Sequence, residues 1–290
     1  MGRHQKVKSG ALKMCKPEAL GRTEDFCFVL FTIPSSQGTF VANMRLTFSK
    51  LDTYNKCPLR FRLRYQEKLP EVSGRGRNLS LILHQTLESF LFNARRDSSL
   101  ATLLRAYETR CAPPQTPEQE RRYQEGQRAL EAFHWREGQR LASAVALEQS
   151  FSVRVGGLEI TGRLDCALET EAGLELIDFK FTSNVPQSPD PLQLQLYALG
   201  LQEITGATPD TLTYYYLRQE QQISFPGGEA AIQEGKEQAI RIAEQLQGDD
   251  SFSPQVGAWC HTCSYDRYCS AQREKPDPVP QLLIQARLPL

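Results

Sequence analysis

The sequence predicts a mixed α/β domain, and three observations indicate it: helical spacing in the first part, a β-rich middle, and a return to helices. Hydrophobic residues make up 40% of the 290 residues and charged residues 23%, with a formal net charge of zero. This is ordinary globular composition, enough for one large domain or two small ones. The predicted order of elements is helices, a strand meander, a helix, further strands and a last helix. This order indicates a sheet flanked by helices.

The first structured part of the chain has helical spacing. Ser49 is a candidate N-cap, and Leu51, Tyr54 and Cys57 recur at intervals of three. A later helix carries an apolar face. Two further helical stretches follow at 98–110 and 117–142, and the proline-rich CAPPQTP separates them.

The spacing then changes to that of strands. ALEQSFSVRV, GLEITGRLDCALE and GLELIDFKFT are β-rich and are joined by Gly-containing turns, which predicts an antiparallel meander. PDPLQLQLYALGLQEI predicts a helix with Asp190 as its cap and Pro191 at its first position. TLTYYYLR and QQISFP predict two more strands, and EAAIQEGKEQAIRIAEQLQ predicts a long amphipathic helix.

The ends of the chain have no sustained period. Residues 1–45 form either a real N-terminal extension with one added strand, or a segment outside the natural protein, whose start would then be Met44. FCFVLFTI, within this segment, is too short to span a bilayer, and the acids before it do not suit a secretory signal. We therefore expect a cytoplasmic protein with no membrane partner. Residues 273–290 are expected to be a Pro-rich tail.

The clearest chemical signal lies in the meander. Asp178 and Lys180 are two residues apart on one strand, so they point to the same face, whereas Phe179 points into the core. Asp165 lies on the preceding strand. Two carboxylates on one sheet face repel each other unless they share a cation, and oxygen ligands suit Mg²⁺ or Mn²⁺. An exposed strand with alternating charges would show the same D-x-K pattern.

Other polar residues flank this signal, each with an ordinary structural explanation beside the functional one. His84 lies on an otherwise apolar helix, where a satisfied core histidine is more common than a ligand. Glu148 lies on the first meander strand, where a surface charge is the simpler interpretation. Gln193 and Tyr197 share one helix face and could hold a phosphate backbone or cover the edge of the core.

In this order, the motifs resemble the PD-(D/E)XK nucleases, specifically the RecB-like branch that includes the RecB and AddB nuclease domains and the CRISPR-adaptation nucleases. Each motif is weak alone, but their order and spacing together are strong. The matching residues are His84, Glu148, Asp165 at the end of GRLD, Asp178 and Lys180 in IDFK, and Gln193 and Tyr197 in QLQLY. The resemblance implies a restriction-endonuclease-like core with a helical insertion, forming a nuclease domain over 46–272.

The resemblance also implies the site. His84, Asp165, Asp178 and the carbonyl of Phe179 would hold Mg²⁺ or Mn²⁺, and Lys180 would orient or activate water. The implied catalytic residues are Asp165, Asp178, Lys180 and Glu148. Gln193 and Tyr197 are the implied pair that positions the DNA strand. The expected activity is exonucleolytic cleavage of single-stranded DNA or DNA ends in repair or recombination.

Two alternatives stay open. The same nuclease could act in CRISPR spacer acquisition beside an integrase rather than beside a helicase in repair. A non-cleaving DNA-end binding module is the alternative from another class. The intact His–Asp–Asp–Lys set argues against the binding module, because a binder needs no mutually repelling carboxylates.

The cysteines form a separate motif. CHTCSYDRYC places Cys260, Cys263 and Cys269 at C-x2-C-x5-C spacing, whereas a structural zinc or a four-iron cluster normally takes four protein ligands. In iron–sulfur members of the resembled branch, one cysteine lies near the domain start, which here is Cys57. The resemblance thus implies a [4Fe-4S] cluster that joins the domain ends, with Zn²⁺ as the competing metal and His261 as a further possible ligand. The remaining cysteines are interpreted as ordinary thiols, with Cys166 buried beside the site: Cys15, Cys27, Cys111 and Cys166.

A local basic segment suggests a nucleic-acid partner. Eight Lys or Arg lie between Lys50 and Arg77 against three acids, and aromatic residues interleave with them. Basic groups with aromatic faces suit single-stranded nucleic acid, although a solvated helix with a buried apolar side is the better interpretation of Phe61 and Tyr65. We expect DNA contacts from the arginines, in particular Arg60, Arg75 and Arg77.

Overall fold

A computed structural model of the chain describes residues 44–71, 78–182 and 184–273. All of them belong to one compact unit within 39–290. The expected extension before Met44, the tail after residue 273 and the loop arginines Arg75 and Arg77 lie outside the described residues, as do Cys15 and Cys27. None of the described helices combines the length and apolarity needed to cross a membrane.

The described part of the chain alternates helices and strands as the sequence predicts. The main elements are β1 (Met44–Thr47), α1 (Phe48–Lys56), α2 (Pro58–Phe61), η1 (Arg62–Gln66), α3 (Asn78–Asn93), α4 (Leu100–Glu108), α5 (Pro117–Glu137), η2 (Arg140–Ser143), β2 (Ala144–Val155), β3 (Leu158–Thr170), β4 (Gly173–Lys180), α6 (Leu192–Thr205), β5 (Thr211–Tyr216), η3 (Leu217–Gln219), β6 (Gln221–Pro226), α7 (Glu229–Gln247), η4 (Ala258–Thr262), η5 (Asp266–Tyr268) and α8 (Ser270–Arg273).

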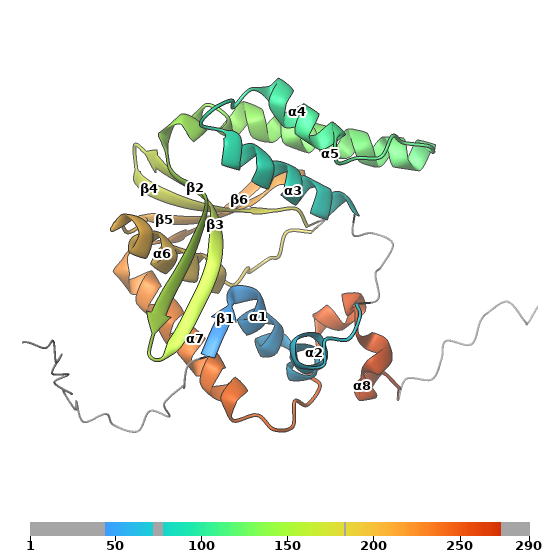
Figure 1. The fold of residues 1–290 in the computed structure, drawn as a ribbon, viewed down its shortest axis with the longest axis vertical. Coiled ribbons are helices and arrows are strands. Elements are labelled where there is room, and N and C mark those ends of the chain that lie inside the picture. The colour runs from blue at the N-terminus through green and yellow to red at the C-terminus, as the bar shows by residue number, and fades with distance from the viewer. Residues whose placement is uncertain (1–43, 72–77, 183, 274–290) are drawn as a thin grey trace, which may run out of the picture. The chain divides into compact units, whose positions relative to one another are not determined.

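The strands form one mixed sheet in the order β1-β3-β4-β5-β6, with β2 paired to β3 (Figure 1). The predicted meander is confirmed, because β2 with β3 and β3 with β4 are antiparallel pairs. Two pairs are parallel, β1 with β3 and β4 with β5. The long strand β3 therefore pairs along its first half with β1 and along its second half with β4, which places β4 near the centre of the sheet.

Helices cover both faces of this sheet (Figure 1). The alternation of side chains assigns neighbours on a strand to opposite faces: Leu176 packs with one apolar cluster and Ile177 with another, and Tyr214 and Tyr215 divide in the same way. The first cluster includes residues of α1, α6 and α7, and the second includes residues of α3, α4 and α5. Burial on both faces explains why these strands are apolar almost throughout.

The predicted helix ends differ from the observed ones by one or more residues. Thr47, not Ser49, caps α1, because its backbone is extended and its hydroxyl accepts from the Lys50 N–H at 3.3 Å. Asp190 does accept from the Leu192 N–H at 2.9 Å, but α6 begins after Pro191 rather than at it. The stretch predicted as helical over 117–142 ends as an α-helix at Glu137, and a short 3₁₀ turn leads into β2.

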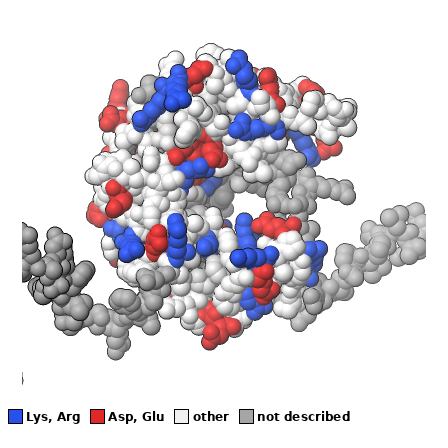
Figure 2. Space-filling model, in the orientation of Figure 1, with Lys and Arg blue, Asp and Glu red and all other residues white. Residues whose placement is uncertain are grey.

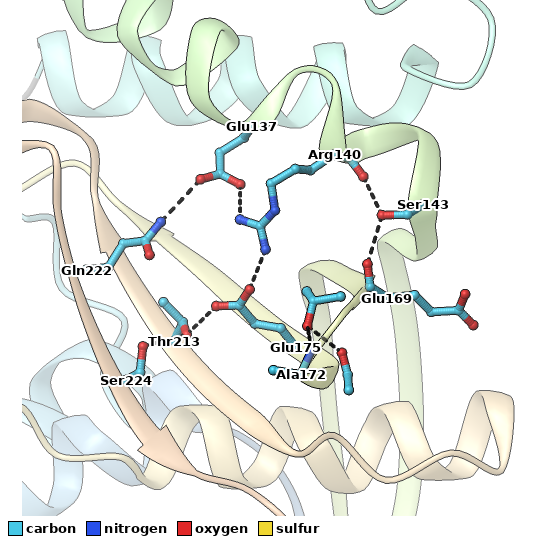
Figure 3. A network of polar contacts seen from close by, with 11 residues as sticks. Glu137, Arg140, Ser143, Glu169, Ala172, Glu175, Thr213, Gln222 and Ser224 are labelled. Atoms are coloured by element: carbon cyan, nitrogen blue, oxygen red, sulfur yellow. Dashed lines mark hydrogen bonds and ion pairs between the residues drawn. The ribbon is translucent and has the colours of Figure 1, made fainter.

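A network of polar side chains, with Glu137 and Thr213 buried, fastens the end of α5 to the sheet (Figure 3). Arg140 lies 2.5 Å from Glu137 and 2.6 Å from Glu175 of β4. The second oxygen of Glu175 accepts from Thr213 at 2.7 Å, and Glu137 also accepts from Gln222 at 3.2 Å. Each buried carboxylate is thus both paired and hydrogen-bonded, which is the condition under which buried charge is tolerated.

A third, small cluster joins the two ends of the domain. Cys57, Leu59 and Leu63 pack with Tyr265, and Trp259 lies against them. The Tyr265 hydroxyl also donates to the Leu69 carbonyl at 3.4 Å. The segment after α7 is therefore held against α2 and η1 by side-chain packing.

Candidate active site

The two predicted carboxylates meet on adjacent strands. Asp165 of β3 and Asp178 of β4 are 8% and 3% exposed, and both line a cavity of about 450 Å³. The Phe179 N–H donates to Asp165 Oδ2 at 2.8 Å, which fixes that carboxylate against the next strand. Phe179 itself is buried in the opposite face against Phe133, as its position in the strand predicts.

Gln193 connects the lysine to a carboxylate. Lys180 Nζ lies 2.6 Å from Asp178 Oδ2 and donates to Gln193 Oε1 at 2.6 Å. The Gln193 Nε2 amide donates to Asp178 Oδ1 at 2.8 Å and to the Tyr197 hydroxyl at 3.0 Å. The expected pairing of Gln193 and Tyr197 on one face of α6 is observed, and it faces the Asp178–Lys180 pair.

The electrostatics of the cavity favour a cation. Burial, the neighbouring Asp178 and then Glu148 raise the pKa of Asp165 well above its ordinary value. Asp178 Oδ2 is buried and accepts no hydrogen bond in the described structure, although Lys180 approaches it as an ion pair. Lys180 forms an ion pair with only one of the two buried carboxylates, and a divalent cation would balance the remaining negative charge.

His84 lies on α3 and lines the same cavity as the two aspartates. Its ring meets that of Phe181 edge-on at 5.9 Å between centroids. Burial lowers its pKa, so the imidazole is neutral at neutral pH, the form in which histidine binds metals. The donor set suits a hard divalent ion. Among the described residues, however, no three His, Cys, Asp or Glu side chains already form a metal-binding arrangement.

Glu148 does not line this cavity but lines a neighbouring depression, together with Arg163. Its side chain is only 4% exposed, so the surface-charge interpretation is wrong, and its oxygen lies 3.1 Å from Arg163. Its backbone has φ of +46°, a conformation that non-glycine residues rarely adopt. Burial raises the pKa of Glu148 to about 7, although Arg163 acts in the other direction.

Several residues near the carboxylates were not predicted. Arg163 lines the cavity and pairs with Glu88 of α3 at 2.5 Å. The ring of Tyr214 lies 5.0 Å from Lys180 Nζ, in cation–π contact. Arg163 precedes Asp165 by two residues, so strand alternation places both on one face and could have identified it. Tyr214 is on a different strand, and no local spacing points to it.

The four predicted cluster ligands also come together. Cys57, Cys260, Cys263 and Cys269 are free thiols that line one small cavity between α2 and the last turns. Burial raises the pKa of Cys263, and the Tyr265 N–H and then Arg60 act in the other direction. No three cysteines of the described chain have a metal-binding arrangement. Cys166 is fully buried next to Asp165, as expected.

The basic segment is less positive than its composition suggests. Figure 2 shows acidic and basic side chains side by side over the region of α1 and α2 rather than a uniform basic surface. The ion pairs are Lys56 with Asp52, Arg62 with Glu67 and Arg64 with Glu71.

The aromatic residues of this segment belong to the core. Phe61 is 6% exposed and packs against Tyr54 and Phe252, and Tyr65 packs on Phe61. The interpretation of both rings as the buried side of a solvated helix is thus confirmed.

A further cavity, of about 400 Å³, lies between α3, α4 and α5. Its wall is mainly apolar, with Leu79, Ile82 and Tyr107, and it shares no residue with the carboxylate cavity. None of the predicted site residues lies in it.

Comparison with known proteins identifies the family. A model described as the PD-(D/E)XK nuclease superfamily matches residues 45–270. Among solved structures, the protein SSO0001 is 15% identical with a TM-score of 0.40, covering 82% of this chain and 90% of its own. A candidate exonuclease from Eubacterium rectale is 12% identical with a TM-score of 0.48, covering 84% of this chain and 94% of its own. No curated protein matches significantly. The family match spans most of the chain and all the carboxylate, lysine and glutamine positions described above, and the chain therefore belongs to the PD-(D/E)XK nuclease superfamily.

Proposed function

We propose that this protein is a divalent-metal-dependent DNA exonuclease that acts on single-stranded DNA or DNA ends in repair or recombination. The observation that carries the proposal is the single cavity in which Asp165, Asp178 and Lys180 meet, with Gln193 hydrogen-bonded to both Asp178 and Lys180. Membership of the nuclease superfamily supports hydrolysis of phosphodiester bonds.

Each residue of the predicted site has a proposed role. His84, Asp165, Asp178 and the carbonyl of Phe179 would hold Mg²⁺ or Mn²⁺. When bound, such an ion offsets the charge that develops on the phosphate and lowers the pKa of nearby water.

Lys180 keeps a positive charge beside that phosphate, where it stabilises the developing negative charge. Water supplies the new oxygen on phosphorus, the bond to the leaving sugar oxygen breaks, and that oxygen takes up a proton. Gln193 holds Lys180 and Asp178 in fixed positions relative to each other. Tyr197 positions the DNA strand, either directly or through Gln193. Glu148 acts from beside the cavity by orienting Arg163.

Two further sets of residues belong to the same proposal. Cys57, Cys260, Cys263 and Cys269 would hold a [4Fe-4S] cluster, or Zn²⁺ in its place, since four thiolates suit both. Their shared cavity supports this assignment. Arg60, together with Arg75 and Arg77 beyond the described residues, would contact the DNA backbone.

Partners and alternatives follow from the same chemistry. A helicase would supply single strands in repair, and an integrase would be the partner in spacer acquisition. A non-cleaving DNA-end binder is the alternative function. The two buried carboxylates beside one lysine favour cleavage, because they would weaken binding of a phosphate without a metal.

End-labelled single-stranded and double-stranded DNA incubated with Mg²⁺, Mn²⁺ or EDTA tests the proposal. We expect cleavage with either metal and none with EDTA. Asp178→Ala should reduce the rate at least a hundredfold while DNA binding is largely retained, because the loss falls on charge stabilisation in the transition state. A wild-type protein that binds DNA ends without cutting them in either metal would establish the binding module instead.

A further inference from the structure

A second depression lies directly beside the carboxylate cavity. It has a volume of about 350 Å³, and its lining includes Gln85, Glu88 and Phe92 of α3 together with Arg110, Glu148 and Arg163. We call it the α3 groove. Arg163 lines both the groove and the carboxylate cavity, so the two are neighbours across one side chain. A polymer whose phosphate lies in the cavity can therefore reach the groove with its next unit.

Arg163 is held in a fixed orientation at this boundary. Its Nη2 lies 2.5 Å from Glu88 and its Nε lies 3.1 Å from Glu148, while the side chain remains 42% exposed. A guanidinium has five N–H donors, so two carboxylate partners leave donors for a phosphate. The two acids of the groove are both engaged by this one cation. Pre-orientation reduces the entropy lost when Arg163 binds an oxyanion.

The groove also presents an aromatic ring and a second cation. Phe92 is 76% exposed, whereas Phe90 and Leu91 before it on α3 are buried. Arg110 donates to the Ala106 carbonyl at 2.9 Å, and within the described chain it forms no ion pair with a carboxylate. A single exposed apolar residue is common and needs no explanation by itself. Phe92 differs in its position, because it lies in a groove with a cation, and that groove shares Arg163 with the carboxylate cavity.

We propose that the α3 groove binds the nucleotide next to the scissile phosphate of single-stranded DNA, with its base stacked on Phe92 and its phosphate between Arg163 and Arg110. The proposal rests on the proposed nuclease function, since that function places the scissile phosphate in the neighbouring cavity. Base–aromatic stacking is tolerant of sequence, so the groove would fix the position of the strand without selecting a base.

Fluorescence anisotropy with the full chain in EDTA tests this without cleavage. The probes are a labelled single-stranded oligonucleotide and a series in which one base at a time is replaced by an abasic site. For the wild type, one position should weaken binding about tenfold when its base is absent. Phe92→Ala should bind the intact strand about tenfold more weakly and lose sensitivity to that position alone. Phe92→Trp should restore both the affinity and the sensitivity.

Two variants complete the design. Trp135→Ala removes an aromatic side chain of nearly the same exposure, 77% against 76%, that lines none of the cavities described above, and it should leave every affinity unchanged. Arg110→Gln should reduce the slope of log affinity against log salt by about one, as expected for the loss of one phosphate contact. Equal thermal unfolding midpoints would show that the variants are folded.

The outcomes separate this inference from the proposed function. If the wild type cuts DNA and Phe92→Ala keeps the wild-type abasic profile, the groove assignment is wrong and the nuclease assignment stands. If the wild type shows the position-specific profile but cuts nothing in Mg²⁺ or Mn²⁺, the groove is supported and the enzymatic proposal fails. If the wild type binds no strand in the series, the assignment of the α3 groove as a nucleotide-binding site is wrong.

Discussion

Gln193 uses the two ends of its amide for different partners, and this explains why an uncharged residue belongs to a charged site. Its oxygen accepts from Lys180, and its nitrogen donates to Asp178 and Tyr197. An amide offers both a donor and an acceptor on one planar group without carrying a charge. The residue therefore sets the distance between the cation and the carboxylate rather than supplying charge itself.

Loss of this amide should affect turnover more than binding. Gln193→Ala is expected to lower kcat about ten- to a hundredfold with a smaller change in KM, because Lys180 and Asp178 lose their common support. Gln195→Ala is the matched control, since Gln195 is a buried amide of the same helix that binds Glu234 instead. A rise in KM alone would mean that Gln193 contacts the strand directly.

Glu148 makes the metal-free protein less stable as the pH rises. Its pKa is about 7 in the folded chain and near 4.5 when unfolded, so the folded state binds the proton more tightly. Its contribution is complete below pH 4.5 and is lost as the pH rises through about 7. Over this window the loss amounts to about 3 kcal/mol.

Glu148→Gln should remove this part of the pH dependence. We expect urea unfolding in EDTA to give a flatter stability profile between about pH 4.5 and 7 for the variant than for the wild type. Glu169→Gln, at an exposed position of β3, should keep the wild-type profile. Parallel profiles for Glu148→Gln and the wild type would contradict the raised pKa.

Local spacing predicted part of this site and left the rest out. Strand alternation placed Asp178 and Lys180 on one face, and helical spacing paired Gln193 with Tyr197. The contact of Gln193 with Lys180, however, depends on how α6 packs on the sheet. The strained, buried position of Glu148 likewise depends on tertiary packing, and the sequence suggested a surface charge there.

At the scale of elements, the sheet was easier to predict than the helix ends. The strands of the meander follow from apolar runs and Gly-containing turns, and β6 and α7 coincide with QQISFP and the long amphipathic segment. Helix ends depend on single side chains that compete to cap the same turn. Thr47 and Ser49 are both capable caps, and the extended backbone at Thr47 decides between them.

The close approach of α6 to the sheet depends on two glycines. A Cβ at Gly200 would lie 2.4 Å from the ring of Phe151, which is buried in β2, and Gly162 on β3 meets the same ring. Phe151 therefore occupies space left by two missing side chains. This packing holds α6, and with it Gln193, against the strands that carry the carboxylates.

Gly200→Ala should destabilise the fold despite the better helix propensity of alanine. We expect a loss of about 1–3 kcal/mol in urea unfolding, because the added methyl overpacks a buried ring. Glu203→Ala, at an exposed position of α6, tests the propensity effect alone and should change stability by less than about 0.5 kcal/mol. A more stable Gly200→Ala variant would show that Phe151 can move aside at no cost.

At the scale of the whole described unit, the chain must bring residues near 57 and near 265 together. No local period predicts this contact; only the resemblance to iron–sulfur nucleases did. Side-chain packing of Leu59, Leu63 and Tyr265 already holds the two ends, and Tyr54 adds a hydrogen bond to Asp249 at 3.0 Å. This cluster is small compared with the two that cover the sheet. A metal held by both ends would therefore add most to the stability of this part.

The cysteine assignment predicts one shared phenotype for residues far apart in sequence. Anaerobically purified protein should be brown and contain about four irons per chain. Cys57→Ala and Cys263→Ala should each lose the colour and lower the thermal midpoint, because either removes a ligand from the same cross-link between the domain ends. Cys111→Ala should keep the colour and the wild-type thermal midpoint, since Cys111 lies between α4 and α5 in a different cavity.

Colourless protein with one zinc per chain would show that Zn²⁺ takes the place of the cluster. The nuclease site would be unaffected, because its carboxylates lie on β3 and β4. Full iron content in Cys57→Ala would instead require a fourth ligand elsewhere, and His261 and Cys166 are the next residues to test. Cys166 is buried in the apolar cluster that packs with α3, α4 and α5, so His261 is the stronger candidate ligand.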